Sequence, residues 1–214
     1  MDIAKFCKEK DCAISNAEFN AIYLYCDKAK DILLSWAIDY DNNDTLGDFL
    51  INTGIESNLS PIEQIFYVAF YYSLSFHKEF DKYNSLTFSS FINELEGLLE
   101  SQKKIAIDKN YSVDFVIDFT TKDVTGFPIL KKPLNLKYAI ELDGFNYHSN
   151  KKQMNYDYER ENELKKAGYN VIRFTGSQIY NHPIKTINDL LEIIKRDIDK
   201  ELENGRKRKN FLLD

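Results

Sequence analysis

The chain has 214 residues, 43% hydrophobic and 14% aromatic, which is enough for one domain of ordinary size with a small helical addition. Its formal net charge is −6, charged residues interrupt the N-terminus as no signal peptide would allow, and no segment approaches the ~18 consecutive apolar residues of a membrane-spanning helix. We therefore expect a soluble, cytoplasmic protein without membrane partners.

Three cysteines, Cys7, Cys12 and Cys26, all lie near the N-terminus. Their odd number, and a spacing that suits no metal site, predict reduced and mostly buried thiols.

The charge is distributed unevenly along the chain. Residues 1–100 carry 7 Lys/Arg against 17 Asp/Glu, a balance of −10, whereas residues 101–214 carry 21 against 17, a balance of +4. If the protein binds a polyanion, the second half is where binding is expected. The alternative is that both halves simply carry solvated surface charge.

Helical spacing dominates the first hundred residues. Residues 17–39 are expected to form one helix, turn residues follow at 39–48, and residues 46–55 favour a short helix. Ser60, Pro61 and Glu63 form a helix start with a capping box, and residues 86–100 read as another helix. The apolar stripe expected in the first helix consists of Phe19, Ile22, Leu24, Ile32, Leu33 and Trp36.

After residue 101 the pattern changes to strands. Residues 103–107, 111–119 and 134–144 read as strands, residues 151–168 as a polar helix ending at Gly168, residues 170–176 as a strand and residues 186–205 as an amphipathic helix. This order predicts an α/β fold with a small mixed sheet flanked by helices. The expected organisation is a helical region at 1–58, a main domain at 59–204 and a basic tail at 205–214.

Two predicted strands contain carboxylates where apolar residues are expected. Asp114 interrupts the apolar run YSVDFVIDF, and Glu141 and Asp143 follow the run KYAI on one face of the next strand. If these strands pair as a hairpin, Asp114 and Glu141 can lie side by side. Asp143 precedes Gly144, and an Asp-Gly turn is an alternative explanation for it alone.

Neighbouring buried carboxylates need a compensating charge. At ~4 Å two like charges repel by roughly 4 kcal/mol at an effective dielectric of 20, so one is protonated or a cation lies between them. Oxygen ligands with open positions suit Mg²⁺, which keeps several waters in protein sites.

The order of these motifs resembles the PD-(D/E)XK nuclease superfamily, and within it the very-short-patch-repair-like endonucleases, over roughly residues 60–198. The resemblance implies that Asp114 and Glu141 bind Mg²⁺, for which Mn²⁺ substitutes, together with the backbone carbonyl of Leu142. It further implies active-site roles for Glu63 on a preceding helix and for Gln102 beside the first strand, and a product with a 5′-phosphate.

The chain departs from the superfamily at one position. Many members have a lysine two residues after the second acid, where it orients the attacking water, but this chain has Asp143. His148 is the expected substitute, as general base or as donor to the phosphate. A structural hydrogen bond is the alternative role for His148.

Several cations near these acids are candidates for supporting the site or contacting phosphate. Asp157 and Arg160 lie three residues apart on one helix, where a local ion pair is the alternative. Arg173 lies in an apolar strand and requires an acidic or phosphate partner. The lysines expected to grip the nucleic-acid backbone are Lys131, Lys132, Lys151 and Lys152, although such runs are commonly solvated surface.

The sequence therefore predicts a Mg²⁺-dependent endonuclease, with DNA as the expected substrate and Glu63, Asp114, Glu141, Asp143 and His148 as its catalytic residues. The N-terminal helices could support a homodimer or bind a partner protein. Two alternatives are a degenerate nuclease that only binds nucleic acid and an acidic adaptor that binds protein.

Overall fold

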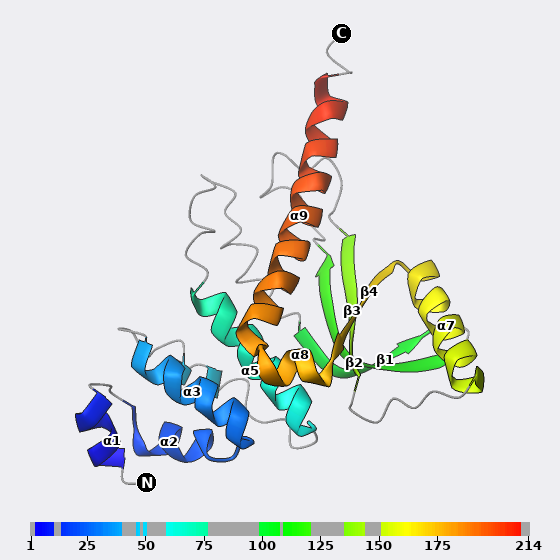
Figure 1. Ribbon diagram of the computed structural model, residues 1–214. Coiled ribbons are helices and arrows are strands. Elements are labelled where there is room, and N and C mark those ends of the chain that lie inside the picture. Colours follow the sequence, from blue (N-terminus) through cyan, green and yellow to red (C-terminus); the bar gives the residue numbers. More distant parts are fainter. Residues whose placement is uncertain are drawn as a thin grey trace. The chain divides into compact units, whose positions relative to one another are not determined.

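The computed structural model describes residues 3–10, 14–39, 46–47, 49–50, 59–76, 99–107, 109–120, 135–143 and 151–210 (Figure 1). The chain divides into two compact units. One comprises Met1–Lys78 with Ser177–Ile187, and the other comprises Glu79–Gly176 with Asn188–Asp214. The predicted boundaries at residues 58 and 204 stay predictions.

The first unit contains helices α1 (Ile3–Lys10), α2 (Asn16–Ile22), α3 (Asp27–Asp39) and α5 (Pro61–Phe76). The expectation of one helix over residues 17–39 is wrong, because α2 ends at Ile22 and Tyr23 is its C-cap. The turn that follows is held from another helix, since the Cys26 amide donates to the Gln64 side chain at 2.8 Å. Leu24 lies in this turn and is 72% exposed, so it does not belong to the buried stripe.

Helix α5 starts where the sequence predicts. The Ser60 amide donates to the Glu63 carboxylate at 2.7 Å, which is one half of the expected capping box. Four aromatic residues of this helix, Phe66, Tyr67, Phe70 and Tyr71, are buried, and Phe66 and Phe70 are among the largest fully enclosed side chains, as is Trp36 of α3.

Other predictions for the N-terminal half have mixed outcomes. Cys7 and Cys26 are free thiols, but both are only half-buried, and Cys12 lies outside the described residues. The turn at 39–48 and the helices at 46–55 and 86–100 fall mostly outside them too. Leu99 and Glu100, expected at the end of a helix, instead open the first strand.

The second unit is built on a four-stranded sheet with the order β1-β2-β3-β4. Its strands are β1 (Leu99–Ala106), β2 (Asn110–Thr120), β3 (Asn135–Asp143) and β4 (Tyr169–Thr175). The pairs β1–β2 and β2–β3 are antiparallel, and β3–β4 is parallel. Because parallel neighbours need a crossover, α7 (Lys151–Lys166) connects them. The predicted α/β fold is confirmed.

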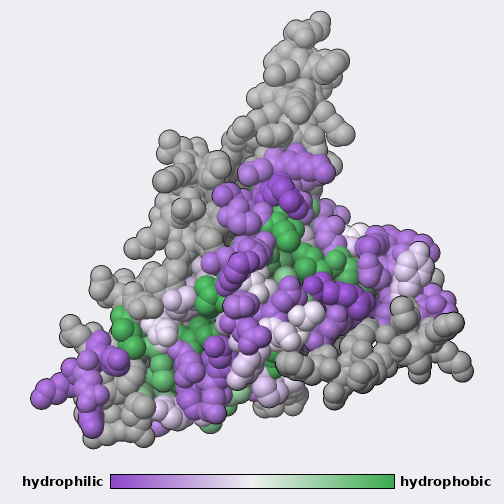
Figure 2. Space-filling view, viewed as in Figure 1, coloured by the Kyte–Doolittle hydropathy of each residue, from purple (hydrophilic) through white to green (hydrophobic). Residues whose placement is uncertain are grey.

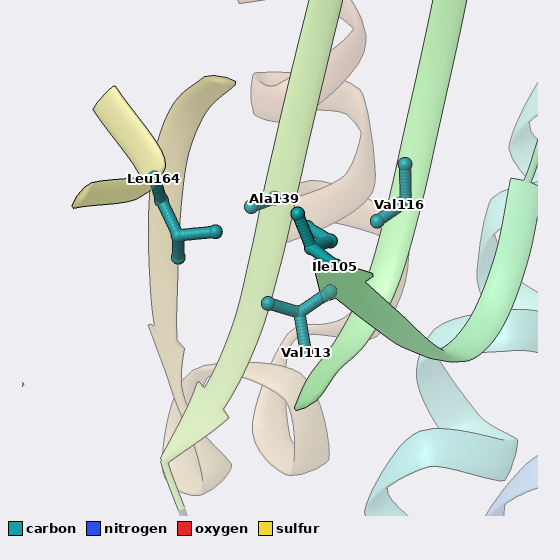
Figure 3. Close-up of a cluster of buried hydrophobic side chains, with 5 residues drawn as sticks. All are labelled: Ile105, Val113, Val116, Ala139 and Leu164. Carbon is teal, nitrogen blue, oxygen red and sulfur yellow. The ribbon is translucent and has the colours of Figure 1, made fainter. Parts of the chain in front are cut away.

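Helices pack against both faces of this sheet. On one face, Leu164 of α7 joins a core of Ile105, Val113, Val116 and Ala139 from three strands (Figure 3). On the other, the buried Tyr138 hydroxyl donates to Asp197 of helix α9 (Pro183–Asn210) at 3.0 Å. The outward surface of α7 is mainly hydrophilic (Figure 2), as its sequence predicts.

The C-terminal part of the chain is more helical than the sequence predicts. The short helix α8 (Gly176–Asn181) was not expected, and α9 starts three residues before the predicted 186. Helix α9 runs through Gly205 to Asn210, so most of the residues expected to form a basic tail are helical. No described helix is both long and apolar enough to cross a bilayer.

Gly168 ends α7 with a φ of +88°, as expected of a glycine after a helix. A Cβ there would meet nothing within 4 Å, so a substitution acts through the backbone alone. We expect Gly168→Ala to lower the free energy of unfolding by about 1 kcal/mol, and Gly168→Asn by less, because asparagine tolerates the left-handed region. Urea denaturation measures both, and equal losses would contradict this explanation.

Candidate active site

The predicted pairing of the two acid-bearing strands is present. The β2–β3 ladder runs from Thr120↔Asn135 to Phe115↔Ile140, and its continuation by one step places Asp114 opposite Glu141. The Asp114 carboxylate reaches β3 directly, where its Oδ2 accepts a hydrogen bond from the Leu142 amide at 2.6 Å. Asp114 therefore links the two strands through its side chain.

Glu141 is buried near the C-terminal end of β3, with 7% of its surface exposed. Burial and, to a smaller extent, the negative charge of Asp114 raise the pKa of Glu141 to about 7, against the opposing positive charges of Arg160 and Arg173. A carboxylate with a pKa near neutrality at a strand end is typical of functional sites, where acids are held away from water beside like charges.

Arg160 is the direct partner of Glu141. One nitrogen of its guanidinium, Nη2, lies 2.5 Å from Glu141 Oε1 and also donates to the Ser112 carbonyl. Arg160 thus connects α7 to β3 and to β2. The local pair with Asp157, the alternative for Arg160, stays a prediction; Asp157 lies half-buried one turn earlier.

A second arginine lies beside the neighbouring acid. Arg173 pairs with Glu141 in the parallel β3–β4 register, and its guanidinium lies 3.8 Å from Asp143 and 3.7 Å from Glu161. Arg173 was expected to have an acidic or phosphate partner, and the structure supplies acidic ones, whereas a contact with phosphate stays a prediction. Asp143, at the position of the superfamily's lysine, thus has a positive charge next to it.

Sequence reasoning did not single out Glu161 or the Ser112 carbonyl. Glu161 also pairs with Lys165 at 2.6 Å, and the four-residue spacing predicts that local pair but not the contact with Arg173. The Ser112 carbonyl leaves no sequence signal at all, because every residue has one.

Of the remaining predicted residues, two lie on other described elements and the others fall outside the described part of the chain. Gln102 lies inside β1 rather than before it, and Glu63 lies in α5 of the other unit. His148, Lys131 and Lys132 fall outside the described residues, as do the side chains of Lys151 and Lys152 at the start of α7. Their functional roles stay predictions.

The donor set of the site is compatible with a divalent cation. Asp114, Glu141 and Asp143 supply three carboxylates against the two arginines, so the cluster has an excess negative charge when Glu141 is ionised. The described residues contain no group of three or more His, Cys, Asp or Glu side chains arranged around one metal position. The expected ligands are the carboxylates of Asp114 and Glu141 and the carbonyl of Leu142. Mg²⁺ commonly takes only a few ligands of this kind from a protein.

A small mixed sheet flanked by helices, with acids meeting at adjacent strand ends, defines a core of the PD-(D/E)XK nuclease type. Residues 94–194 match the model of the family described as REase_MTES_1575, a restriction-endonuclease-like family. The superfamily resemblance is thereby confirmed, and the very-short-patch-repair group stays a prediction. No curated protein and no solved structure matches the chain.

The raised pKa of Glu141 makes the stability of the cation-free protein depend on pH. Between pH 4.5 and 7 the folded state keeps a proton that the unfolded state has released, so stability falls as pH rises through this range. The full change in the free energy of unfolding is about 3 kcal/mol at most. Urea denaturation in chelator from pH 4 to 8 measures it.

Two variants test whether Glu141 is the group responsible. Glu141→Gln cannot titrate, so its stability relative to the wild type should increase between pH 5 and 8. Arg160→Met removes a positive charge that opposes the rise in the Glu141 pKa. The pH range over which stability falls should therefore extend to higher pH. A constant difference between the wild type and Glu141→Gln across the range would contradict the assignment.

Proposed function

We propose that this chain is a divalent-cation-dependent endonuclease that uses Mg²⁺, with Mn²⁺ as a substitute, and cleaves DNA. The observation that carries the proposal is the pair of carboxylates at facing strand ends, Asp114 linked to β3 and Glu141 buried beside it. The family of residues 94–194 supports nuclease chemistry, and the excess negative charge supports a cation requirement, since a bare acidic site would repel phosphate.

Each residue of the cluster has a distinct part in this proposal. Asp114, Glu141 and the Leu142 carbonyl would hold the cation, which when bound supplies charge stabilisation at the phosphate and lowers the pKa of a water. Arg160 fixes the orientation of Glu141 through its second contact, the Ser112 carbonyl. Arg173 offsets the charge of Asp143, and His148 handles the water proton in place of the lysine.

The flanking residues would act on the substrate or on the surrounding structure. Lys151 and Lys152, at the N-terminal end of α7, would contact the phosphate backbone, whose charge favours lysine and arginine. Asp157 would support α7 beside Arg160. The N-terminal helices of the first unit would bind a second copy or a partner protein.

A nucleic-acid-binding protein without cleavage is the second candidate. The position that carries lysine in many superfamily members holds Asp143, whose carboxylate lies 3.8 Å from Arg173. Plasmid, single-stranded DNA and RNA incubated with Mg²⁺, Mn²⁺ or chelator separate the two candidates. Cation-dependent products support the endonuclease, and binding that weakens with salt but gives no product supports the second candidate.

Asp114→Asn and Glu141→Gln should each lower cleavage at least ~10²-fold, because each removes a charge that holds the cation. The matched control is Asp118→Asn, on the same strand but paired with Lys137 at 3.7 Å, which should keep activity within a few-fold. Initial rates over a Mg²⁺ series measure the effect. Wild-type rates in both acid variants would contradict the proposal.

Glu63 has two competing explanations that one substitution separates. Its carboxylate accepts the Ser60 amide, a capping role that glutamine can also fill. We predict that Glu63→Gln keeps its melting temperature within about 2 °C, whereas cleavage falls several-fold, as the active-site role that the superfamily resemblance implies for Glu63 requires.

The control for this prediction is Glu18→Gln. Glu18 occupies the same capping position in α2, where its carboxylate accepts the Ser15 amide at 2.6 Å. Glu18→Gln should change neither the melting temperature nor cleavage. If Glu63→Gln retains wild-type cleavage at limiting Mg²⁺, Glu63 is only a cap.

A further inference from the structure

The Glu141 carboxylate is engaged by the protein through one of its two oxygens. Arg160 Nη2 lies 2.5 Å from Oε1, so this oxygen accepts a charge-assisted hydrogen bond from the guanidinium. Among the residues that the structure describes, no second donor is hydrogen-bonded to this carboxylate. Oε2 is therefore the oxygen that remains to meet a cation.

The position of Arg160 is fixed from two sides. Its Nη2 also donates to the Ser112 carbonyl, a backbone group whose place is set by the sheet. Four residues later, on the same face of α7, Leu164 is buried in the core with Val113 and Ala139 (Figure 3). The Arg160 side chain is itself largely enclosed, with 15% of its surface exposed. We therefore expect Arg160 to keep its contact with Glu141 when a cation binds.

Divalent cations differ in how they use a carboxylate. Ca²⁺ takes about six to eight oxygen ligands and can bind both oxygens of one carboxylate, whereas Mg²⁺ requires near-octahedral geometry and keeps several waters. A carboxylate with one oxygen held by an arginine can serve Mg²⁺ fully but offers Ca²⁺ one ligand fewer. Hydrogen bonds to the ligands are a general means by which proteins tune a metal site.

We propose that Arg160 is a specificity-determining residue, which holds Oε1 of Glu141, confines this carboxylate to coordination through one oxygen and so favours Mg²⁺ over Ca²⁺. The inference rests on the proposed function, because it needs a cation at the two acids, and it adds a reason for the choice of cation. The alternative is that Arg160 only neutralises Glu141 until a cation displaces it. The loss of Arg160 would then strengthen the binding of both cations alike.

The test is the ratio of Ca²⁺ affinity to Mg²⁺ affinity, measured by calorimetry on the full chain. The loss of a positive charge, and any change in the protonation of Glu141, affects two ions of equal charge to the same extent, so these effects cancel in the ratio. In Arg160→Met we expect the ratio to rise at least ~5-fold over the wild type, because Ca²⁺ gains the second oxygen of Glu141.

The matched control is Arg173→Met. It removes the other arginine of the cluster, whose guanidinium lies beside Asp143 and Glu161. Both affinities should change together, and the ratio should stay within about 2-fold of the wild-type value, because the lost charge acts equally on both ions.

A second measurement, on the wild type, decides the question if Arg160→Met does not fold. Infrared difference spectra with and without each cation separate the two modes of coordination. The antisymmetric and symmetric stretches of a carboxylate lie further apart when one oxygen binds a metal than when both do. Glu141→Gln identifies the bands of this residue. We expect coordination through one oxygen of wild-type Glu141 with Mg²⁺ and with Ca²⁺.

The outcomes separate this inference from the proposed function. An unchanged ratio in Arg160→Met, an equal rise in Arg173→Met, or coordination of Ca²⁺ by both oxygens of wild-type Glu141 overturns the specificity role. A wild type that binds neither cation overturns both the specificity role and the proposed function. If the wild type binds cations but cleaves no nucleic acid, the proposed nuclease activity fails, while the affinity ratio still decides the role of Arg160.

Discussion

The buried carboxylate of Glu141 is the constraint on which the second unit depends. Withdrawing it from water beside Asp114 raises its pKa to about 7, and Arg160 is the charge that offsets this cost. Arg160 can do so only if α7, β3 and β2 keep fixed positions, because the same nitrogen also contacts the Ser112 carbonyl. The crossover helix is therefore part of the site's electrostatics as well as a connection between parallel strands.

The strands around this charge are also linked by a side chain. The Asp114 carboxylate on β2 accepts a hydrogen bond from the Leu142 amide of β3 at 2.6 Å. Arg173, on β4, lies between Asp143 and Glu161 and balances the far side of the cluster. A site of this kind holds acidic and basic side chains in close contact, with more carboxylates than arginines when Glu141 is ionised.

Much of the fold was predictable because its signals are local. Apolar alternation gave β2, β3 and β4, and helical spacing with a capping residue or a terminal glycine gave α5 and α7. The errors arose where a distant contact decides. Residues 17–39 have continuous helical spacing, but Gln64 binds the Cys26 amide and fixes a turn. Leu99 and Glu100 continue a helical pattern, yet β2 pairs with them as a strand.

The sequence by itself indicated the class of site. Burying a carboxylate inside an apolar strand costs free energy, so such residues point to a site whichever way the strands pack. Only the tertiary structure decided which groups meet them. The partners of Asp114 and Glu141 lie 28 and 19 residues away, and the second contact of Arg160 spans 48 residues. The left-handed backbone of Gln102 was equally hidden, since glutamine has no local preference for that conformation.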